Sequence, residues 1–209
     1  MNQEIPEEKA EAKPQLHILG VSGSMRENSR CARVTGDILS ASQNYGAQTR
    51  LLDLHEIDLP MFRTGAPRDE HTGRDTANEA VNWAHAFVLV TPDYHGSMSG
   101  AMKNFLDYHW REFGGKLFGY ICASNEKGLT VIDQMRTAIR QCYGWSLPYG
   151  LSLSSSDFDE DGALSNETTH ARVLMMGRDL AVYGSLIHEQ FARDIQDDDP
   201  RTFAARYRL

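Results

Sequence analysis

Residues 86–91 read Ala-Phe-Val-Leu-Val-Thr, an apolar run in which hydrophobic and polar side chains do not alternate. A strand with one face in water alternates, whereas a strand of a parallel sheet covered by helices on both faces is apolar throughout. Pro92 ends the run, because proline has no amide hydrogen to give to a central ladder. The run therefore predicts a buried strand at the centre of an α/β fold.

Strand and helix patterns alternate on both sides of this run. Short apolar segments predict further strands at residues 16–21, 49–54, 117–123 and 146–153. Apolar residues at helical spacing predict helices around residues 31–39, 73–84, 100–108, 131–142 and 166–187. We expect one doubly wound parallel sheet of five strands, in the order 2-1-3-4-5, with helices on both of its faces.

Length and charge limit the class of protein. The 209 residues predict a single domain, which we place at residues 15–190, between a charged N-terminal tail (1–14) and a C-terminal tail or arm (191–209). Lys and Arg number 21 against 29 Asp and Glu, so the formal net charge is −8. A negative chain does not favour nucleic acid or an anionic membrane surface as a partner. The apolar runs are far shorter than the ~20 residues that span a membrane.

The cysteines indicate the compartment. Cys31, Cys122 and Cys142 are odd in number and form no CxxC pair or Cys/His cluster. A disulfide framework and a metal site are therefore not expected. The acidic N-terminus lacks the apolar core of a secretory signal. We expect reduced thiols and a cytoplasmic protein.

The first of two unusual segments follows the first predicted strand, at residues 22–30, where the next helix begins. Its polar side chains are those of Ser22, Ser24, Arg26, Asn28 and Ser29. Hydroxyl groups, a guanidinium and the free amides of a helix N-terminus together suit a monophosphate. The segment lacks the glycine and lysine pattern of a Walker A loop and the GxGxxG pattern of a dinucleotide site. The alternative is an ordinary helix start, capped by Asn28 or Ser29, with Arg26 in solvent.

The second segment, residues 91–100, follows the central strand. In the predicted strand order, the first and third strands are neighbours whose connections leave toward opposite faces, and ligands bind in the crevice between them. Tyr94 offers an aromatic surface to a planar ligand, and Gly96 lets a ligand approach the backbone. The amides of Gly96 and Ser97 are then expected to meet ring heteroatoms. A planar ring on one loop and a phosphate on the other match flavin mononucleotide (FMN).

These two segments resemble the motifs of the NADPH-dependent FMN reductase family of flavodoxin-like proteins. SGSMRENS (residues 22–29) resembles the family's GSxRxxS phosphate loop, and TPDYHGSMSGAMKNFLD (residues 91–107) resembles its PEYNGSxPGxLKNxID flavin loop. The resemblance covers roughly residues 16–155. Asp93, His95 and Ser99 replace the family's Glu, Asn and Pro, and this second segment is also similar to that of arsenic-resistance flavoproteins.

The resemblance implies a flavodoxin-like fold and a set of cofactor-binding residues. Those for the FMN phosphate are Ser22, Ser24, Arg26, Asn28 and Ser29. Those bordering the ring are Pro92, Tyr94, His95, Gly96 and Ser97, with Ser124 and Asn125 at its far edge. No side chain is assigned a catalytic role with certainty, because flavin carries the redox chemistry and the protein supplies position and electrostatics. Tyr94, His95 and Gly96 are the residues expected next to the ring.

The implied activity is transfer of electrons from NADPH or NADH through FMN to a small-molecule acceptor, namely a flavin, a quinone, an azo compound or a metal oxyanion. Two alternatives stay open in this fold class: a flavodoxin-type electron carrier, and an arsenic-resistance-type reductase or oxidase. A flavin-free structural protein on the same fold is a further alternative, and it predicts a colourless protein. The resemblance to this family implies a homodimer or homotetramer. The aromatic cluster Tyr108-His109-Trp110 is the expected subunit interface.

Overall fold

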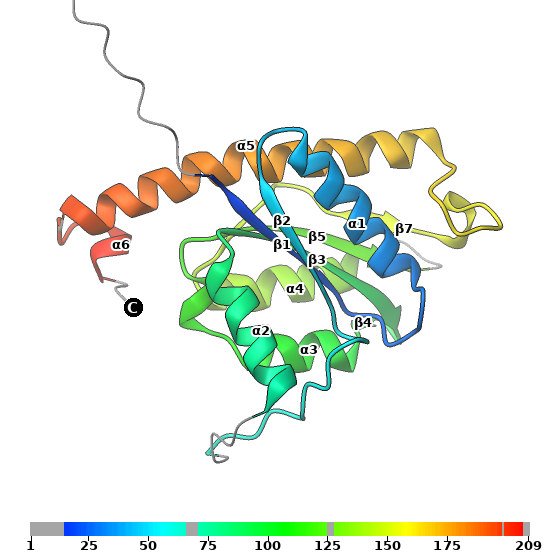
Figure 1. Cartoon of the computed structure of the whole chain (residues 1–209), viewed down its shortest axis with the longest axis horizontal. Coiled ribbons are helices and arrows are strands. Elements are labelled where there is room, and N and C mark those ends of the chain that lie inside the picture. The colour runs from blue at the N-terminus through cyan, green and yellow to red at the C-terminus, as the bar shows by residue number, and fades with distance from the viewer. Residues whose placement is uncertain (1–14, 66–70, 125–127, 198, 207–209) are drawn as a thin grey trace, which may run out of the picture.

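A parallel sheet forms the centre of the computed structural model, which describes residues 15–65, 71–124, 128–197 and 199–206 (Figure 1). Its strand order is β2-β1-β3-β5, and two short strands, β6 and β7, both pair in parallel with the outer edge of β5. The remaining strand, β4, forms a hairpin with β3. The bounds are β1 His17–Ser22, β2 Gln48–Asp53, β3 Ala86–Tyr94, β4 Ser97–Met98, β5 Leu117–Ala123, β6 Trp145–Ser146 and β7 Leu151–Leu153.

Helices cover both faces of the sheet. Figure 1 shows α1 and α5 on one face and α2, α3 and α4 on the other. Two short 3-10 helices, η1 and η2, lie in the connections. The bounds are α1 Arg30–Gln43, α2 Thr72–Trp83, α3 Gly100–Asp107, η1 Arg111–Phe113, α4 Leu129–Gln141, η2 Ser155–Asp157, α5 Glu167–Asp197 and α6 Phe203–Arg206. The flavodoxin-like doubly wound fold predicted from the sequence is confirmed.

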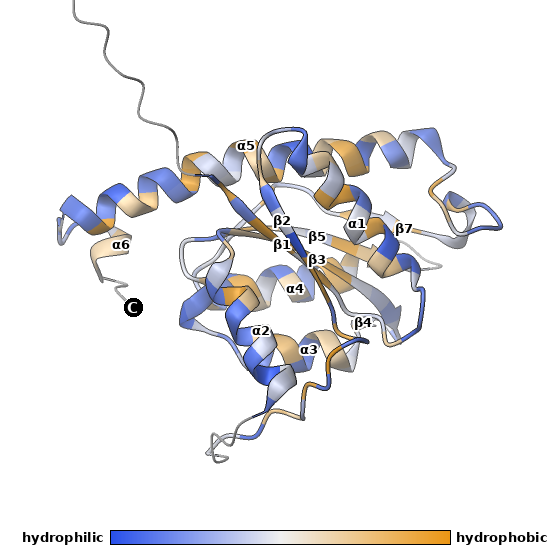
Figure 2. Cartoon of the chain, in the orientation of Figure 1, coloured by the Kyte–Doolittle hydropathy of each residue, from blue (hydrophilic) through white to orange (hydrophobic). Residues whose placement is uncertain are grey.

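The central strand separates two hydrophobic cores. Phe87 and Leu89 of β3 pack with α2, α3 and α4, while Val88 and Val90 pack with α1 and α5. All four side chains are fully buried. Figure 2 shows the hydrophobic residues gathered on the strands and the inward helix faces. The unbroken apolar run therefore predicted the two-sided burial correctly, because each face of this strand needs its own apolar contacts. The expected end at Pro92 was wrong, because the strand continues to Tyr94 and Pro92 pairs with Ala123 of β5.

The strand register aligns the ends that carry the unusual loops. Ser22, the last residue of β1, pairs with Asp53 of β2 and Val90 of β3. The chain leaves β1 for α1 on one face and leaves β3, through β4, for α3 on the other face. A crevice is expected where two neighbouring parallel strands diverge in this way.

The predicted fifth strand is interrupted. Residues 146–153 were expected as one strand, but the structure has β6 and β7 on either side of Pro148. The amide of Leu147 still donates to the carbonyl oxygen of Phe118 at 2.9 Å. Pro148 has no amide hydrogen with which to continue the ladder, so the strand breaks there.

Helix α5 continues ten residues beyond its predicted end, to Asp197 rather than to residue 187. Residues 191–197, expected in a C-terminal tail or arm, therefore continue the helix. His188 stacks on His85 with ring centroids 3.7 Å apart. Phe191 lies against Gly115, where a Cβ would come within 2.4 Å of its ring. These contacts join residues distant in sequence, which helical periodicity alone does not show. The predicted N-terminal tail, 1–14, lies outside the described residues.

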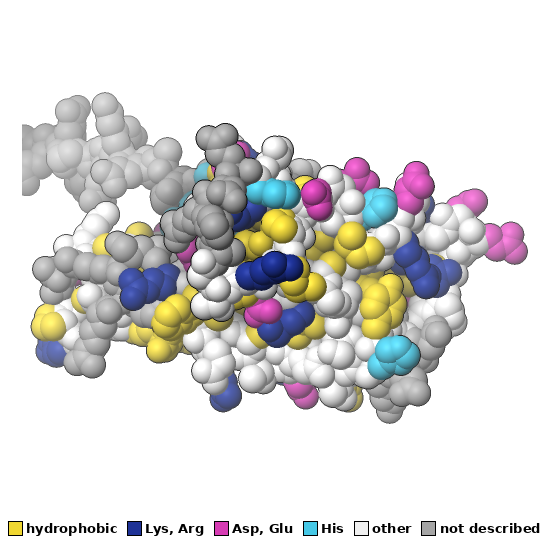
Figure 3. Space-filling model, turned by 90° about the horizontal axis from the view of Figure 1, so that it is seen from below, with side chains coloured by type: hydrophobic (Ala, Val, Ile, Leu, Met, Phe, Trp, Pro, Cys, Tyr) yellow, Lys and Arg dark blue, Asp and Glu magenta, His cyan; other side chains and the backbone are white. Residues whose placement is uncertain are grey.

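The aromatic cluster Tyr108-His109-Trp110 is only partly exposed. His109 is 4% exposed, and its ring nitrogens lie 3.0 Å from the carbonyl oxygen of Phe105 and 3.1 Å from Oδ1 of Asn78. The prediction that His109 lies at a subunit surface was wrong, because its ring is buried between Asn78 of α2 and Phe105 of α3. Trp110 is 57% exposed. Figure 3 shows a face of the molecule on which hydrophobic, acidic and basic side chains are interspersed.

Among the described residues, no helix is both long enough and apolar enough to cross a membrane.

Candidate functional site

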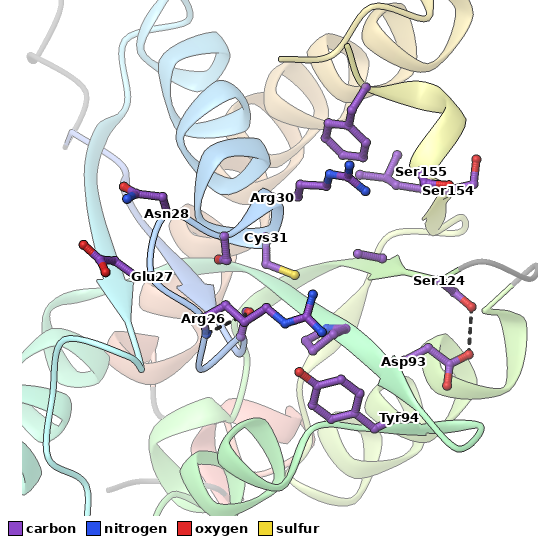
Figure 4. Close-up of a pocket in the computed structure, with 16 residues that line it drawn as sticks. Arg26, Glu27, Asn28, Arg30, Cys31, Asp93, Tyr94, Ser124, Ser154 and Ser155 are labelled. Carbon is purple, nitrogen blue, oxygen red and sulfur yellow. Dashed lines mark hydrogen bonds between the residues drawn. The ribbon is translucent and has the colours of Figure 1, made fainter. Parts of the chain in front are cut away.

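A cavity of about 470 Å³ opens where β1, β3, β5 and β7 end (Figure 4). Its volume falls within the range of about 300–1,000 Å³ that is typical of small-molecule sites. Its lining is polar on the whole, with a few apolar walls. The lining residues are Ser24, Arg26, Glu27, Asn28, Ser29, Arg30, Cys31, Pro92, Asp93, Tyr94, Ala123, Ser124, Leu153, Ser154, Ser155 and Phe158.

The loop between β1 and α1 forms one wall of the cavity. Its position on the sheet is fixed by the amide of Gly23, which donates to the carbonyl oxygen of Val90 at 2.8 Å. Ser24 Oγ accepts from the amide of Arg26 at 3.3 Å. Ser29 is the N-cap of α1 and accepts from the amide of Ala32 at 3.1 Å. Each hydroxyl accepts a bond in this way and still carries a proton that it can donate to a ligand.

Ser29 therefore caps α1, as one alternative from the sequence predicted, and the same loop also forms a polar wall of the cavity. Asn28 does not cap the helix; it adopts a left-handed backbone with φ +51°, a region that Asn visits more readily than most residues. In Figure 4, Arg26 extends across the cavity toward Tyr94, whereas Glu27 and Asn28 lie on the opposite side of the loop. Arg26 therefore faces the cavity more directly than Asn28 does.

The loop after β3 is a tight β-hairpin, which the sequence analysis did not predict. Tyr94 pairs with Ser97, and the two residues between them, His95 and Gly96, have φ values of +59° and +75°. Two residues with positive φ are the pattern of a type I′ turn, which matches the twist of the flanking strands. Gln134 of α4 holds the turn: its Oε1 accepts from Ser97 Oγ at 3.0 Å, and its Nε2 donates to the carbonyl oxygen of Gly96 at 3.2 Å.

Asp93 connects this hairpin to the next loop. Its Oδ1 accepts from the amide of Gly96 at 2.8 Å, and its Oδ2 accepts from Ser124 Oγ at 2.8 Å (Figure 4). The Gly96 amide, which the sequence predicts to meet a ring heteroatom, is therefore hydrogen-bonded to Asp93 in the structure. The replacement of the family's Glu by Asp keeps a carboxylate at this junction.

Seven of the twelve predicted binding residues line the cavity: Ser24, Arg26, Asn28, Ser29, Pro92, Tyr94 and Ser124. His95, Gly96 and Ser97 do not; they form the turn beyond Tyr94. Ser22 does not line it either, because its side chain is fully buried at the end of β1. Its Oγ is one of two buried side-chain polar atoms among the described residues that have no hydrogen-bond partner. Asn125 lies outside the described residues.

One wall of the cavity, the segment after β7, was not predicted from the sequence. Ser154, Ser155 and Phe158 come from this segment. Asp157 anchors it: Thr169 Oγ1 and Ser154 Oγ donate to its carboxylate at 2.7 and 2.9 Å. Burial alone would raise the pKa of Asp157, but these hydrogen bonds outweigh burial and hold the pKa below its ordinary value. The rule that ligands bind at the carboxyl ends of parallel strands applied to this segment as well, and it was the available signal.

Cys31 contributes a thiol rather than a thiolate to the cavity. Burial raises its pKa to about 12; the carboxylate of Asp53 adds to the shift, and Arg26 opposes it. Burial also raises the pKa of Cys122 to about 12. A thiol with so high a pKa is a poor nucleophile at neutral pH. The cavity therefore offers binding groups and no activated nucleophile at Cys31, the cysteine that lines it.

The donor set fits a phosphorylated planar molecule such as FMN. Hydroxyl protons at Ser24 and Ser29 and the guanidinium of Arg26 lie on one wall, at the start of α1. Pro92 and Tyr94 supply an apolar and aromatic wall on the other side. The fold is flavodoxin-like, and its crevice at the β1–β3 divergence carries both walls.

The chain belongs to the NADPH-dependent FMN reductase family, whose model matches residues 16–159. It is 28% identical to an NADPH azoreductase of Bacillus sp. (strain OY1-2) over 154 residues, 70% of this chain and 84% of that protein. It is 26% identical to an FMN-dependent NADPH-azoreductase of Staphylococcus aureus (strain USA300), over 68% of this chain and 80% of that protein. It is 21% identical to the NADPH-dependent FMN reductase ArsH of Shigella flexneri, over 83% of this chain and 71% of that protein.

Solved structures share the fold. The apo form of the NADH:FMN oxidoreductase EMOB aligns with a TM-score of 0.68 at 17% identity, over 81% of this chain and 90% of that one. FerB, a flavoenzyme NAD(P)H:acceptor oxidoreductase from Paracoccus denitrificans, aligns with a TM-score of 0.66 at 16% identity, over 84% and 98%. The family membership makes this chain an FMN-dependent NAD(P)H oxidoreductase, as the two motifs predicted.

Proposed function

We propose that FMN binds in the cavity with its phosphate at the β1–α1 loop and its ring against Pro92 and Tyr94. One observation carries the proposal: two loops about 70 residues apart in the sequence, each suited to one end of FMN, line the same cavity. The phosphate is held by Ser24, Arg26 and Ser29, supported by the amides at the N-terminus of α1. Ser22, at the end of β1, and Asn28, in the β1–α1 loop, remain proposed phosphate-binding residues because they adjoin these three.

The ring is bordered on its other sides by the hairpin and by the loop after β5. Ser124 and Asn125 lie at its far edge in this proposal, and His95, Gly96 and Ser97 shape the turn beside it. When bound, FMN supplies the redox chemistry between a reduced nicotinamide and an acceptor. The residues of this chain bind and orient both molecules, so their contribution is positioning rather than covalent chemistry.

The acceptor is a small molecule of the flavin, quinone, azo or metal-oxyanion class. The relatives named as azoreductases support an azo compound as the acceptor. The relative named ArsH supports the alternative of an arsenic-resistance-type reductase. Tyr94 is 42% exposed beside the cavity, which is compatible with entry of an acceptor from that side.

Titration with FMN and riboflavin, followed by anaerobic reduction, tests the proposal. We expect FMN to bind, riboflavin to bind more weakly because it lacks the phosphate, and NADPH or NADH to bleach the bound flavin rapidly. Turnover with quinones, azo dyes and metal oxyanions then identifies the acceptor class. Binding of FMN without reduction by either nicotinamide would instead support the electron-carrier alternative. Failure to bind FMN would refute the proposal.

We also propose that the protein forms a homodimer or homotetramer and that it is cytoplasmic. Cys31, Cys122 and Cys142 are free thiols in the structure, which suits a reducing compartment. The exposed indole of Trp110 is a residue that a subunit contact would cover. Light scattering on the FMN-loaded protein, with and without Trp110→Ala, measures the assembly and the part of Trp110 in it. A monomer at micromolar concentration would refute this part.

A further inference from the structure

The cavity contains a second guanidinium group, that of Arg30, which FMN binding does not explain. Arg26 and Arg30 both line the cavity, and neither makes an ion pair with a carboxylate within the part of the chain that the structure describes. Two carboxylates also line it: the oxygens of Asp93 already accept from Gly96 and Ser124, and Glu27 lies on the opposite side of the loop from Arg26 (Figure 4). The cavity therefore holds two positive groups whose hydrogen-bond donors are available to an anion.

Arg30 is held in place by an aromatic ring. Its guanidinium carbon lies 5.0 Å from the ring centroid of Phe158, within the range of a cation–π contact. Phe158 is itself 8% exposed and forms a β-bridge with Leu164. A guanidinium whose face is on a ring keeps its N–H edge for two parallel hydrogen bonds to an oxyanion. The contact with Phe158 thus favours one position of Arg30 before any ligand arrives.

The two arginines serve different parts of the cavity. Figure 4 shows Arg26 directed toward Tyr94 and Arg30 directed toward Ser154 and Ser155, on the wall formed by the segment after β7. One phosphate monoester carries at most two negative charges, and the β1–α1 loop already offers it Arg26, two hydroxyls and helix amides. A second oxyanion is therefore the ligand that the position of Arg30 suits.

We propose that Arg30, in cation–π contact with Phe158, binds an oxyanion group of the second substrate and selects substrates that carry one. This inference rests on the proposed function. The 2′-phosphate of NADPH is the group to which we assign it, so the enzyme discriminates NADPH from NADH through Arg30. A sulfonate or similar group on an acceptor has the same chemistry and is the other source of such an oxyanion.

The test compares Arg30→Gln with wild type and with Arg140→Gln, a control on the exposed side of α4. With an uncharged quinone as acceptor, we expect Arg30→Gln to raise the KM for NADPH about tenfold or more, as the loss of a charge-assisted bond implies. The KM for NADH and the Kd of FMN are expected to change less than twofold. Phe158→Leu keeps an apolar side chain but removes the ring face, and we expect a smaller rise, about two- to fivefold.

A direct binding measurement separates this inference from the proposed function. Calorimetry with adenosine 2′,5′-bisphosphate and with 5′-AMP, on FMN-loaded protein, reports the 2′-phosphate without turnover. Weaker binding of the bisphosphate alone in Arg30→Gln supports the assignment even if wild type oxidises neither nicotinamide, a result that would refute only the proposed function. A selective rise in KM for a sulfonated azo dye over its uncharged analogue supports the same chemistry on the acceptor.

Two outcomes overturn the inference. If Arg30→Gln weakens FMN binding and leaves the bisphosphate and every second substrate unchanged, Arg30 belongs to the FMN phosphate site. If Arg30→Gln behaves like Arg140→Gln in all measurements, Arg30 has no ligand in this cavity.

Discussion

Ser99 Oγ donates a 2.6 Å hydrogen bond to the carbonyl oxygen of Gly23, and this bond joins the two loops of the site. The same Oγ accepts from the amide of Met102 as the N-cap of α3, and the amide of Ser99 donates to Thr91 Oγ1 at 3.0 Å. A Cβ at position 23 would lie 2.9 Å from Cβ of Met102, so the close approach requires glycine. The serine that replaces the family's proline thus fixes the β1–α1 loop against α3.

Replacing Ser99 with alanine is expected to lower both stability and FMN affinity. The loss of an N-cap costs about 0.5–2 kcal/mol, and the buried carbonyl of Gly23 loses its donor as well. We expect urea unfolding to show a free energy of unfolding lower by about 1–3 kcal/mol, and FMN titration a several-fold higher Kd. Ser185→Ala, which removes a bond to Glu189 on α5, is the control and should leave the Kd unchanged. An unaltered Kd in Ser99→Ala would show that this bond does not position the loop.

Arg26→Ala tests the phosphate wall. Removing a charge-assisted hydrogen bond costs about 1.5–3 kcal/mol, which corresponds to a Kd for FMN higher by roughly 10- to 150-fold. Riboflavin has no phosphate, so its Kd is expected to be the same in wild type and variant. Fluorescence quenching of each flavin measures both constants. Equal FMN affinity in the two proteins would remove Arg26 from the site.

The sheet and the two loops were predictable because their signals are local. Strand β5 was predicted with the bounds it has, and the apolar run of β3 showed its burial. Alternation of strands and helices then left few topologies, and strand order placed both loops at one edge. The β1–α1 loop could be singled out because hydroxyl groups and a guanidinium occur together at a helix start, and the structure places this loop on the cavity.

The rest depended on contacts between distant residues. The continuation of α5 to Asp197 follows from His188 meeting His85 and from Phe191 meeting Gly115, pairs that no local pattern displays. His95 and Gly96 both have positive φ, as in a hairpin turn that commonly has the sequence Asn-Gly. Because His stands in place of Asn here, the sequence did not indicate the turn. The wall with Ser154 and Phe158 was missed because its sequence carries no motif.

Gly96→Val is expected to loosen the flavin site through the backbone. Gly96 has φ +75°, and a Cβ there would meet nothing within 4 Å, so the protein itself does not block the side chain. A β-branched residue in this conformation is strained by about 1–3 kcal/mol, and relief of the strain would disturb the bonds from Gly96 to Asp93 and Gln134. Gly46→Val is the matched control, with φ +84° and equally open space, remote from the cavity. We expect both variants to unfold at lower urea concentration and only Gly96→Val to bind FMN more weakly. Full FMN occupancy in Gly96→Val would show that the hairpin does not support the ring.

Stability is expected to fall as the pH drops below about 7, because of a stack of imidazoles at the edge of the sheet opposite the cavity. The ring of His85 lies between those of His17 and His188, with centroids 4.6 and 3.7 Å away. Burial lowers the pKa of His85 to about 3, and the charges of His188, His17 and Lys116 add to the shift. Burial also lowers the pKa of His188, which Lys116 and His17 reinforce and Glu189 opposes.

The sign follows from proton binding in the two states. In the unfolded chain His85 and His188 titrate near ~6.5, whereas in the folded chain burial keeps these two imidazoles neutral to lower pH. The unfolded state therefore binds more protons below this value, so this contribution to stability is complete above about pH 7 and is lost progressively toward pH 3. Urea unfolding of wild type, His188→Gln and His85→Asn from pH 8 to pH 4.5 measures the slope. We expect each variant to flatten it, whereas the exposed His170→Gln on α5 keeps the wild-type slope. Parallel curves for all four proteins would assign the acid sensitivity to other groups.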